Sequence, residues 1–248
     1  LPLLKETNNN SNYLTPKISL RLNPGDMKDS SSVDRTINVD NIFEINRLGI
    51  DDSFEEGKSL TIGIDYKKEN LTDINKFFEA KLATVIRDQD ENFIPKTSGI
   101  NKKTPNIFGS LTNNFSEFIN IDYNFILDND LNTLEYNSIS TSLNYKNFTT
   151  SFNFIEENKS FGNTNTLENN TRFKLNEDNY LSFNTRRNRK INLTEYYDLV
   201  YEYKNDCLVA GIKYNKTYYE DRDLKPSENL LFTITLTPLT SFEQKIDQ

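Results

Sequence analysis

The stretch that decides the fold alternates apolar and polar side chains: Leu60-Thr61-Ile62-Gly63-Ile64-Asp65-Tyr66. A period of two places successive side chains on opposite faces of an extended strand, so the apolar residues share one face while Thr, Gly and Asp share the other. The alternation returns between Ile119 and Leu127, where Asn120, Asp122 and Asn124 oppose the apolar residues. We therefore expect strands that have one apolar and one polar face.

Similar alternations follow at short intervals along the chain. They are carried by Ile139, Leu143 and Tyr145; Phe148, Phe152 and Phe154; Phe173 and Leu175; Leu181 and Phe183; Tyr197, Leu199, Tyr201 and Tyr203; Leu208, Ala210, Ile212 and Tyr214; and Leu230, Phe232, Ile234 and Leu236. This spacing predicts an all-β meander of about a dozen antiparallel strands joined as hairpins. Tight links are expected at 146–147 and 177–179 and longer polar ones around 156–166 and 186–195, an alternation typical of outer-membrane barrels.

The pattern divides the chain into three regions. They are residues 1–57, with a strand at Tyr13–Leu22, a polar loop at Lys28–Asp34 and a strand or short helix at Asp40–Arg47; the meander at 58–238; and a tail at 239–248. The first region is the least regular of the three.

The composition is too polar for a conventional packed core. Apolar residues make up 35% of the 248 residues, and the mean hydropathy is -0.70. Disorder or a solenoid would suit such a chain, but an aromatic share of 12% argues against disorder. No stretch approaches the roughly 20 apolar residues of a membrane-spanning helix, whereas a transmembrane β-barrel needs only every second residue to be apolar. Tyr clusters near strand ends suit the aromatic girdles of such a barrel, although cross-strand pairing in a soluble sheet would also explain them.

Charge and rare residues exclude several functions. The net charge of -8 and the scattered Lys and Arg disfavour nucleic acid as a partner. With no His, a Ser nucleophile in this chain lacks its usual base, so we expect no enzyme activity and no cofactor. The carboxylate pairs lack the spacing of a calcium loop and are predicted to be solvated surface: Glu55 with Glu56, Glu156 with Glu157, and Asp221 with Asp223.

Four stretches resemble the lipopolysaccharide-assembly outer-membrane protein family LptD, particularly its alphaproteobacterial members. They are Leu14-Thr15-Pro16-Lys17 running into Leu22-Asn23-Pro24; Asn46-Arg47-Leu48-Gly49 followed by Asp51, Phe54, Glu55 and Gly57; Arg186-Arg187-Asn188 with 193–203; and Asn205-Asp206-Cys207-Leu208 with 218–223 and the final Thr-rich strand. The resemblance covers almost the whole chain. It implies the C-terminal part of a large barrel, whose earlier strands, signal peptide and periplasmic jellyroll precede Leu1.

The resemblance also implies a function and partners. In this family, lipopolysaccharide arrives along a periplasmic bridge protein (LptA-like), its sugars cross the barrel lumen, and it enters the outer leaflet through a lateral gate. A plug lipoprotein (LptE-like) usually occupies the barrel, and outer-membrane lipid surrounds it. The expected location is therefore the Gram-negative outer membrane, as an integral protein. A generic outer-membrane porin or receptor is the alternative, and a soluble β-solenoid adhesin is a third interpretation.

The gate in this family is the seam between the first and last strands, and we expect residues 229–238 to form the last strand. Phe232, Ile234 and Leu236 would face lipid with Leu230, and Thr233, Thr235 and Thr237 would face the lumen. Pro238 has no N–H to donate, so the seam would open more easily there. Alternatively, Pro238 simply terminates the strand.

Cys207, the single cysteine, falls in a tight turn after Asn205 and Asp206. It is either a leftover thiol or a disulfide partner, and free thiols are uncommon in an oxidising periplasm. Family members commonly carry a cysteine pair in this turn that bonds to the N-terminal periplasmic part. The resemblance therefore implies one disulfide from Cys207 to a cysteine upstream of Leu1.

One basic cluster stands out, formed by Arg186, Arg187, Arg189 and Lys190. Arginine pairs well with phosphate, so these residues are candidate contacts for the phosphates and core sugars of lipopolysaccharide. The alternative is a charged loop that flanks a barrel strand.

Overall fold

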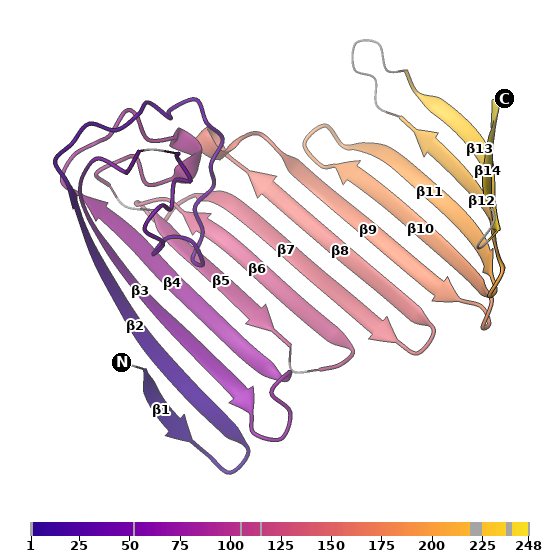
Figure 1. Ribbon diagram of the computed structural model, residues 1–248, viewed down its shortest axis with the longest axis horizontal. Helices are drawn as coiled ribbons and strands as arrows, with labels where there is room; N and C mark the ends of the chain where they lie inside the picture. The colour runs from indigo at the N-terminus through magenta and orange to yellow at the C-terminus, as the bar shows by residue number, and fades with distance from the viewer. Residues whose placement is uncertain are drawn as a thin grey trace. The chain divides into compact units, whose positions relative to one another are not determined.

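A single antiparallel sheet accounts for nearly all of the regular structure. The computed structural model describes residues 2–51, 53–104, 106–114, 116–218, 225–236 and 240–247, the last range as backbone only. Within these residues, fourteen strands are hydrogen-bonded to one another in chain order (Figure 1). The prediction of an all-β meander of hairpins is therefore confirmed.

The strands have the following bounds: β1 (Leu3–Glu6), β2 (Asn10–Asn23), β3 (Gly57–Asn70), β4 (Phe77–Arg87), β5 (Ile107–Asn113), β6 (Ile119–Leu127), β7 (Leu134–Tyr145), β8 (Phe148–Glu157), β9 (Asn165–Lys174), β10 (Asn179–Asn188), β11 (Leu193–Lys204), β12 (Leu208–Thr217), β13 (Ser227–Leu236) and β14 (Thr240–Asp247). Two single-turn 3-10 helices lie in connections, η1 (Lys96–Ser98) and η2 (Lys159–Phe161). Among the described residues, no helix is long and apolar enough to cross a membrane.

Three predictions about local structure were wrong. Asp40–Arg47 is a series of turns and forms neither a strand nor a helix. The connection predicted at 186–195 is only 189–192, because β10 continues through Arg186 and Arg187 and β11 begins at Leu193. The predicted tail at 239–248 contains β14, which pairs with β13 from Asn229↔Asp247 to Leu236↔Thr240.

The chain forms two compact units. The first comprises Leu1–Ile139 with Ile155–Thr164, and the second comprises Ser140–Phe154 with Asn165–Gln248. In the first unit the long connections are 24–56 and 88–106, which follow β2 and β4, whereas the connections that follow β1, β3 and β5 are short. In the second unit β9, β10 and β11 are all followed by short turns, at 175–178, 189–192 and 205–207.

Each unit has one face of exposed apolar side chains, here called the apolar face. In the first unit Ile62, Ile64, Leu82 and Ile86 on β3 and β4 are between 41% and 46% exposed. In the second unit the strand register aligns one such row across five strands: Phe173, Leu181, Tyr201, Ile212 and Phe232. Continuous exposed apolar surface of this kind is rare on water-soluble monomers and is what lipid-facing strands present.

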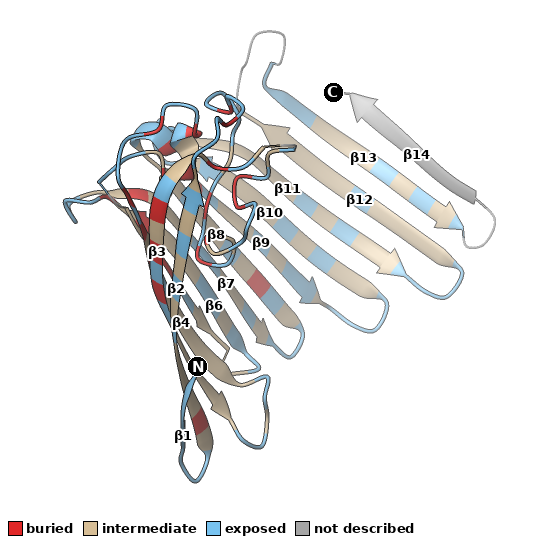
Figure 2. Cartoon of the chain, turned by 60° about the vertical axis from the view of Figure 1, so that its left-hand side comes forward, coloured by how far each residue is buried: buried red, intermediate tan, exposed pale blue. Residues whose placement is uncertain are grey.

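On the opposite, polar face of the first unit, the two long connections build a hydrophobic core (Figure 2). The buried apolar residues come from the connections and from the facing strands: Met27, Ile37, Val39, Ile42, Leu48, Ala83, Val85, Ile94, Ile100, Phe108, Ile126 and Phe161. A glycine on β3 makes room for this packing, because a Cβ at Gly63 would lie 2.7 Å from the ring of Phe43. The loop 24–56, here called the long loop, is therefore packed against the sheet rather than extended into solvent.

Candidate functional site

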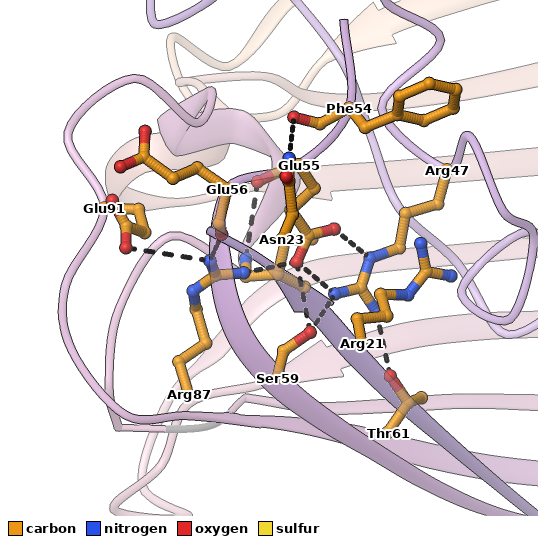
Figure 3. Close-up of polar contacts among 12 residues, drawn as sticks. Arg21, Asn23, Arg47, Phe54, Glu55, Glu56, Ser59, Thr61, Arg87 and Glu91 are labelled. Carbon is orange, nitrogen blue, oxygen red and sulfur yellow. Dashed lines mark hydrogen bonds and ion pairs between the residues drawn. The ribbon is translucent and has the colours of Figure 1, made fainter. Parts of the chain in front are cut away.

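A buried cluster of charges attaches the long loop to the polar face (Figure 3). Arg47 of the loop forms a bidentate pair with Glu55, with Nε 2.6 Å from Oε2 and Nη2 2.5 Å from Oε1. Arg87 at the end of β4 also binds Oε1 of Glu55. The side chains of Arg47 and Arg87 have no exposed surface, and that of Glu55 is 5% exposed. One carboxylate is thus shared by two guanidiniums that reach it from different segments.

Most of the remaining donors of the two arginines are also satisfied by neighbouring groups, although Arg87 Nε has no hydrogen-bond partner among the described residues. Arg47 Nη1 donates to Thr61 Oγ1 at 2.9 Å and to the carbonyl of Ile42 at 3.2 Å, and Nη2 donates to Ser59 Oγ at 3.2 Å. Arg87 Nη2 donates to the carbonyl of Glu56 at 2.6 Å. A buried ion pair is tolerated only when such extra hydrogen bonds offset the loss of hydration. The cluster therefore requires the loop and β3 to lie together in one arrangement.

Further contacts hold the loop to neighbouring strands. Arg21 of β2 donates to the carbonyls of Glu44 and Ile45, the second at 2.8 Å. Lys81 of β4 pairs with Asp40 at 2.8 Å. The long loop is therefore tied to β2, β3 and β4 by polar contacts in addition to its apolar core.

The pKa of the Glu55 carboxyl is lowered from its ordinary value. Burial alone would raise this pKa, but the hydrogen bonds and positive charges of Arg47 and Arg87 outweigh burial. Glu55 is consequently ionised at neutral pH, and the cluster has its attractive form there.

The prediction that Glu55 belongs to a solvated carboxylate pair was wrong. In the sequence Glu55 stands next to Glu56, which suggests a pair of adjacent surface charges. The two arginine partners of Glu55 lie 8 and 32 residues away in the sequence. The available signal was the second stretch that resembles LptD, which contains both Arg47 and Glu55. Glu156 and Glu157 belong to β8, and Asp221 and Asp223 lie outside the described residues.

A second polar cluster joins the remaining connections of the first unit. Lys159 in η2 lies 2.8 Å from Asp128 and 3.4 Å from Glu135, and Asn106 donates to Glu135 at 2.9 Å. The hydrogen bond from Lys159 lowers the pKa of Asp128 to about 2. Within the described part of the chain, no group of three or more Cys, Asp or Glu side chains is arranged to hold a metal ion.

In the second unit the polar face is lined by ion pairs. Arg186 of β10 lies 3.4 Å from Glu168 and 2.9 Å from Glu195. The other pairs are Arg172 with Glu202 at 3.3 Å and Lys213 with Asp198 at 2.9 Å. Each of these three cations faces a carboxylate, so these three charges on the polar face are compensated.

The structure separates the four residues of the predicted basic cluster. Arg186 and Arg187 are consecutive in β10 and therefore point to opposite faces. Arg187 shares the apolar face with Leu181 and Phe183 and donates to the side chain of Asn192. Arg189 lies with its guanidinium 5.2 Å from the ring centre of Phe154. Arg187, Arg189 and Lys190 make no ion pair with another described residue, in contrast to Arg186.

The strand expected to be last is β13, and it is followed by β14. Phe232, Ile234 and Leu236 are exposed on its apolar face, in the predicted alternation with Thr233 and Thr235. Both edges of β13 are hydrogen-bonded, one to β12 and the other to β14. β13 itself therefore has no free edge, while Thr237 and Pro238 lie outside the described residues.

Cys207 lies in the short turn between β11 and β12 and is exposed. The turn is closed by Asn205, whose Oδ1 accepts hydrogen bonds from the backbone N–H groups of Cys207 at 3.0 Å and Leu208 at 2.8 Å. This geometry presents the thiol to solvent at one end of the strands.

An antiparallel meander with an exposed apolar face and an ion-paired polar face defines the class of protein, an integral outer-membrane protein of β-barrel type. The family model LptD, described as LPS transport system D, matches residues 1–178. The chain therefore belongs to the LptD family of lipopolysaccharide transport proteins, and the predicted family is confirmed.

Solved structures and curated proteins add little to this assignment. A variant of the Rh. blastica porin is 8% identical with a TM-score of 0.41, over 96% of this chain and 86% of the porin. A triple mutant of the Rhodopseudomonas blastica porin is 7% identical with a TM-score of 0.40, over 96% of this chain and 85% of the porin. No curated protein matches the chain. Likeness at this level does not identify a function.

We predict that Glu55→Gln will detach the long loop from the sheet. The substitution leaves Arg47 and Arg87 buried without their counter-charge, which costs about 3–5 kcal/mol for a broken buried pair. Limited proteolysis of the full protein in detergent should cut within 24–56 faster in this variant. Glu44→Gln is the matched control, because Glu44 is an exposed glutamate of the same loop whose contact with Arg21 uses its backbone carbonyl.

The same measurement should depend on pH in the native protein. A lowered pKa means that the stabilisation by Glu55 is fully present above the unfolded value of about 4.3 and is lost as pH falls through the lower folded value. Protection of the loop should therefore be constant from neutral pH to about 5 and should fall only in more acidic solution. Equal protection of the Glu55→Gln and native loops at pH 7 would contradict the role given to this carboxylate.

Proposed function

We propose that this protein forms part of the barrel that delivers lipopolysaccharide into the outer leaflet of a Gram-negative outer membrane. Membership of the LptD family is the observation that carries the proposal. We further propose that the chain is the C-terminal part of an LptD of alphaproteobacterial type, following upstream barrel strands and a periplasmic jellyroll. Its function is then transport without covalent chemistry.

The polar face of the second unit suits the passage of a sugar chain. Arg172, Arg186 and Lys213 on this face are paired with carboxylates, so sugar hydroxyls would meet compensated charges and neutral amides there rather than strong isolated sites. Contacts of this kind form and break readily, which favours movement over retention. The apolar face would remain in contact with membrane lipid.

The partners follow from the family. We propose an LptA-like bridge protein that hands over lipopolysaccharide through the N-terminal domain, and an LptE-like lipoprotein that occupies the barrel. The lateral gate would lie at an edge other than those of β13, since both edges of β13 are already paired. Residues 230–236 then support the gate as part of the adjoining wall.

Depletion of the full-length protein in its host tests the function directly. Newly made, pulse-labelled lipopolysaccharide should stall in the inner membrane and periplasm instead of reaching the surface. Arrival of the label at the surface at the normal rate would make a generic porin or receptor the better account of this chain.

Within this function, we assign contacts with lipopolysaccharide phosphate to Arg187, Arg189 and Lys190. These three cations lack a carboxylate partner among the described residues, and Arg187 is on the apolar face where a lipid would lie. Arg186 is omitted because Glu168 and Glu195 already pair with it. Charge-assisted hydrogen bonds from guanidinium to phosphate are among the strongest available at a surface.

Replacing Arg187, Arg189 and Lys190 together by Gln should reduce cross-linking of lipopolysaccharide to a photoreactive residue at the exposed position 191 several-fold. Arg186→Gln is the matched control and should leave this cross-linking unchanged. Equal cross-linking in the native and triple variants would remove the phosphate assignment, and a loss in the Arg186 variant alone would move it to the polar face.

We also propose that Cys207 forms a disulfide with a cysteine of the N-terminal periplasmic part. The exposure of the thiol and its place in a short turn support this, because short turns are the periplasmic connections of outer-membrane barrels. A thiol-reactive reagent applied to the denatured, unreduced full-length protein should leave Cys207 unlabelled and should label it after reduction. Labelling before reduction would show a free thiol.

A further inference from the structure

A cavity of about 210 Å³ lies between the long loop and the polar face of the first unit. One wall is the loop segment 36–40, and the other is formed by β5, β6 and β7. Phe108 and Ile126, which are 1% and 3% exposed, form an apolar floor. A small cavity with an apolar floor and polar walls has the general form of a ligand site.

Two polar side chains in this cavity are available to a ligand. Asn124 of β6 and the hydroxyl of Tyr136 of β7 line it, and neither makes a hydrogen bond to another described residue. Asn124 offers one acceptor and two donors, and Tyr136 offers a hydroxyl beside an aromatic ring. Both residues are only partly buried, so a molecule in the cavity can reach them.

The opposite wall is held in place before any ligand arrives. Asn38 Oδ1 accepts hydrogen bonds from the backbone N–H groups of Asp40 at 2.9 Å and Asn41 at 3.1 Å. Asp40 is paired with Lys81 of β4 at 2.8 Å. A wall fixed in this way lowers the entropic cost of binding, because the segment need not become ordered on contact with the ligand.

The charges of the cavity indicate the chemical class of the ligand. Asp40 is the one charged residue that lines it, and this carboxylate shares Lys81 with Glu79. A phosphate would therefore find no cation in the lining of the cavity. A neutral molecule with several hydroxyls and one apolar face fits the amide, the hydroxyl and the apolar floor together, and a pyranose ring has this chemistry.

We propose that this cavity is a binding subsite for one neutral pyranose unit of a sugar chain. The inference rests on the proposed function, in which the cargo carries such a chain across the polar face. Its few neutral hydrogen bonds would give weak, rapidly reversible binding. The long loop then has a second role, since it supplies one wall of the subsite.

The test uses the full protein purified in detergent and, as probe, the core oligosaccharide released from lipopolysaccharide by mild acid hydrolysis. Saturation-transfer NMR should show transfer to the sugar protons from the native protein. The double variant Asn124→Leu with Tyr136→Phe removes both free polar groups and should weaken binding about tenfold, as expected for two neutral hydrogen bonds. Asn147→Leu, in the exposed short turn between β7 and β8, is the matched control and should bind as the native protein does.

Protease protection of residues 24–56 shows whether the variants keep the loop in place. If the double variant does not keep it in place, the single variant Tyr136→Phe is used for the binding measurement instead. Absence of transfer from the native protein, or equal binding by native and variant proteins, would overturn the subsite. Either result leaves the proposed transport function standing if depletion still stalls labelled lipopolysaccharide. Loss of that stall would instead overturn the transport function on which the subsite rests.

Discussion

One carboxylate shared by two buried arginines determines how the first unit is built. Arg47, Glu55 and Arg87 are all removed from water, so each depends on the other two for the interactions that replace hydration. The cluster can form only when the long loop lies against β3 and β4, and this position also encloses the apolar side chains of the loop. The wall of the cavity at 36–40 follows from the same constraint. Specific placement of the loop, rather than added stability, is the consequence of burying these charges.

The strands could be predicted because their signal is local. Alternation over a few residues, as from Leu60 to Tyr66, sets the face of every side chain without reference to distant partners. The long loop has no such period: Ile37, Val39, Ile42 and Leu48 are separated by polar residues and become a core only through contacts with β4, β5 and β6. Glu55 was misinterpreted for the same reason, since its partner Arg87 is far away in sequence. Strand β14 contains only Phe242 and Ile246 as large apolar residues, so its pairing with β13 had little local signal.

The basic cluster shows the limit of treating neighbours in sequence as neighbours in space. Four cations at 186–190 look like one charged loop, but extending β10 through Asn188 places Arg186 and Arg187 on opposite faces. Two glutamates then compensate Arg186, while Arg187 remains without an ion pair among the described residues. The period of two that predicted the strands also places Arg186 and Arg187 on opposite faces, once the strand is extended past Thr185.

An amphipathic cargo places opposite demands on the polar face and the apolar face of a barrel wall. A polar face that binds sugars too strongly would hold the chain in place, and unpaired charges among low-dielectric surroundings bind strongly. Pairing Arg172, Arg186 and Lys213 with carboxylates on the polar face of the second unit reduces that difficulty, because these charges stay hydrated without being isolated. The long loop meets the same requirement in the first unit, where Asp40 is paired with Lys81 beside the cavity. Unpaired cations are tolerated on the other face at 187–190, where the end of β10 would meet lipid phosphates rather than the moving sugar chain.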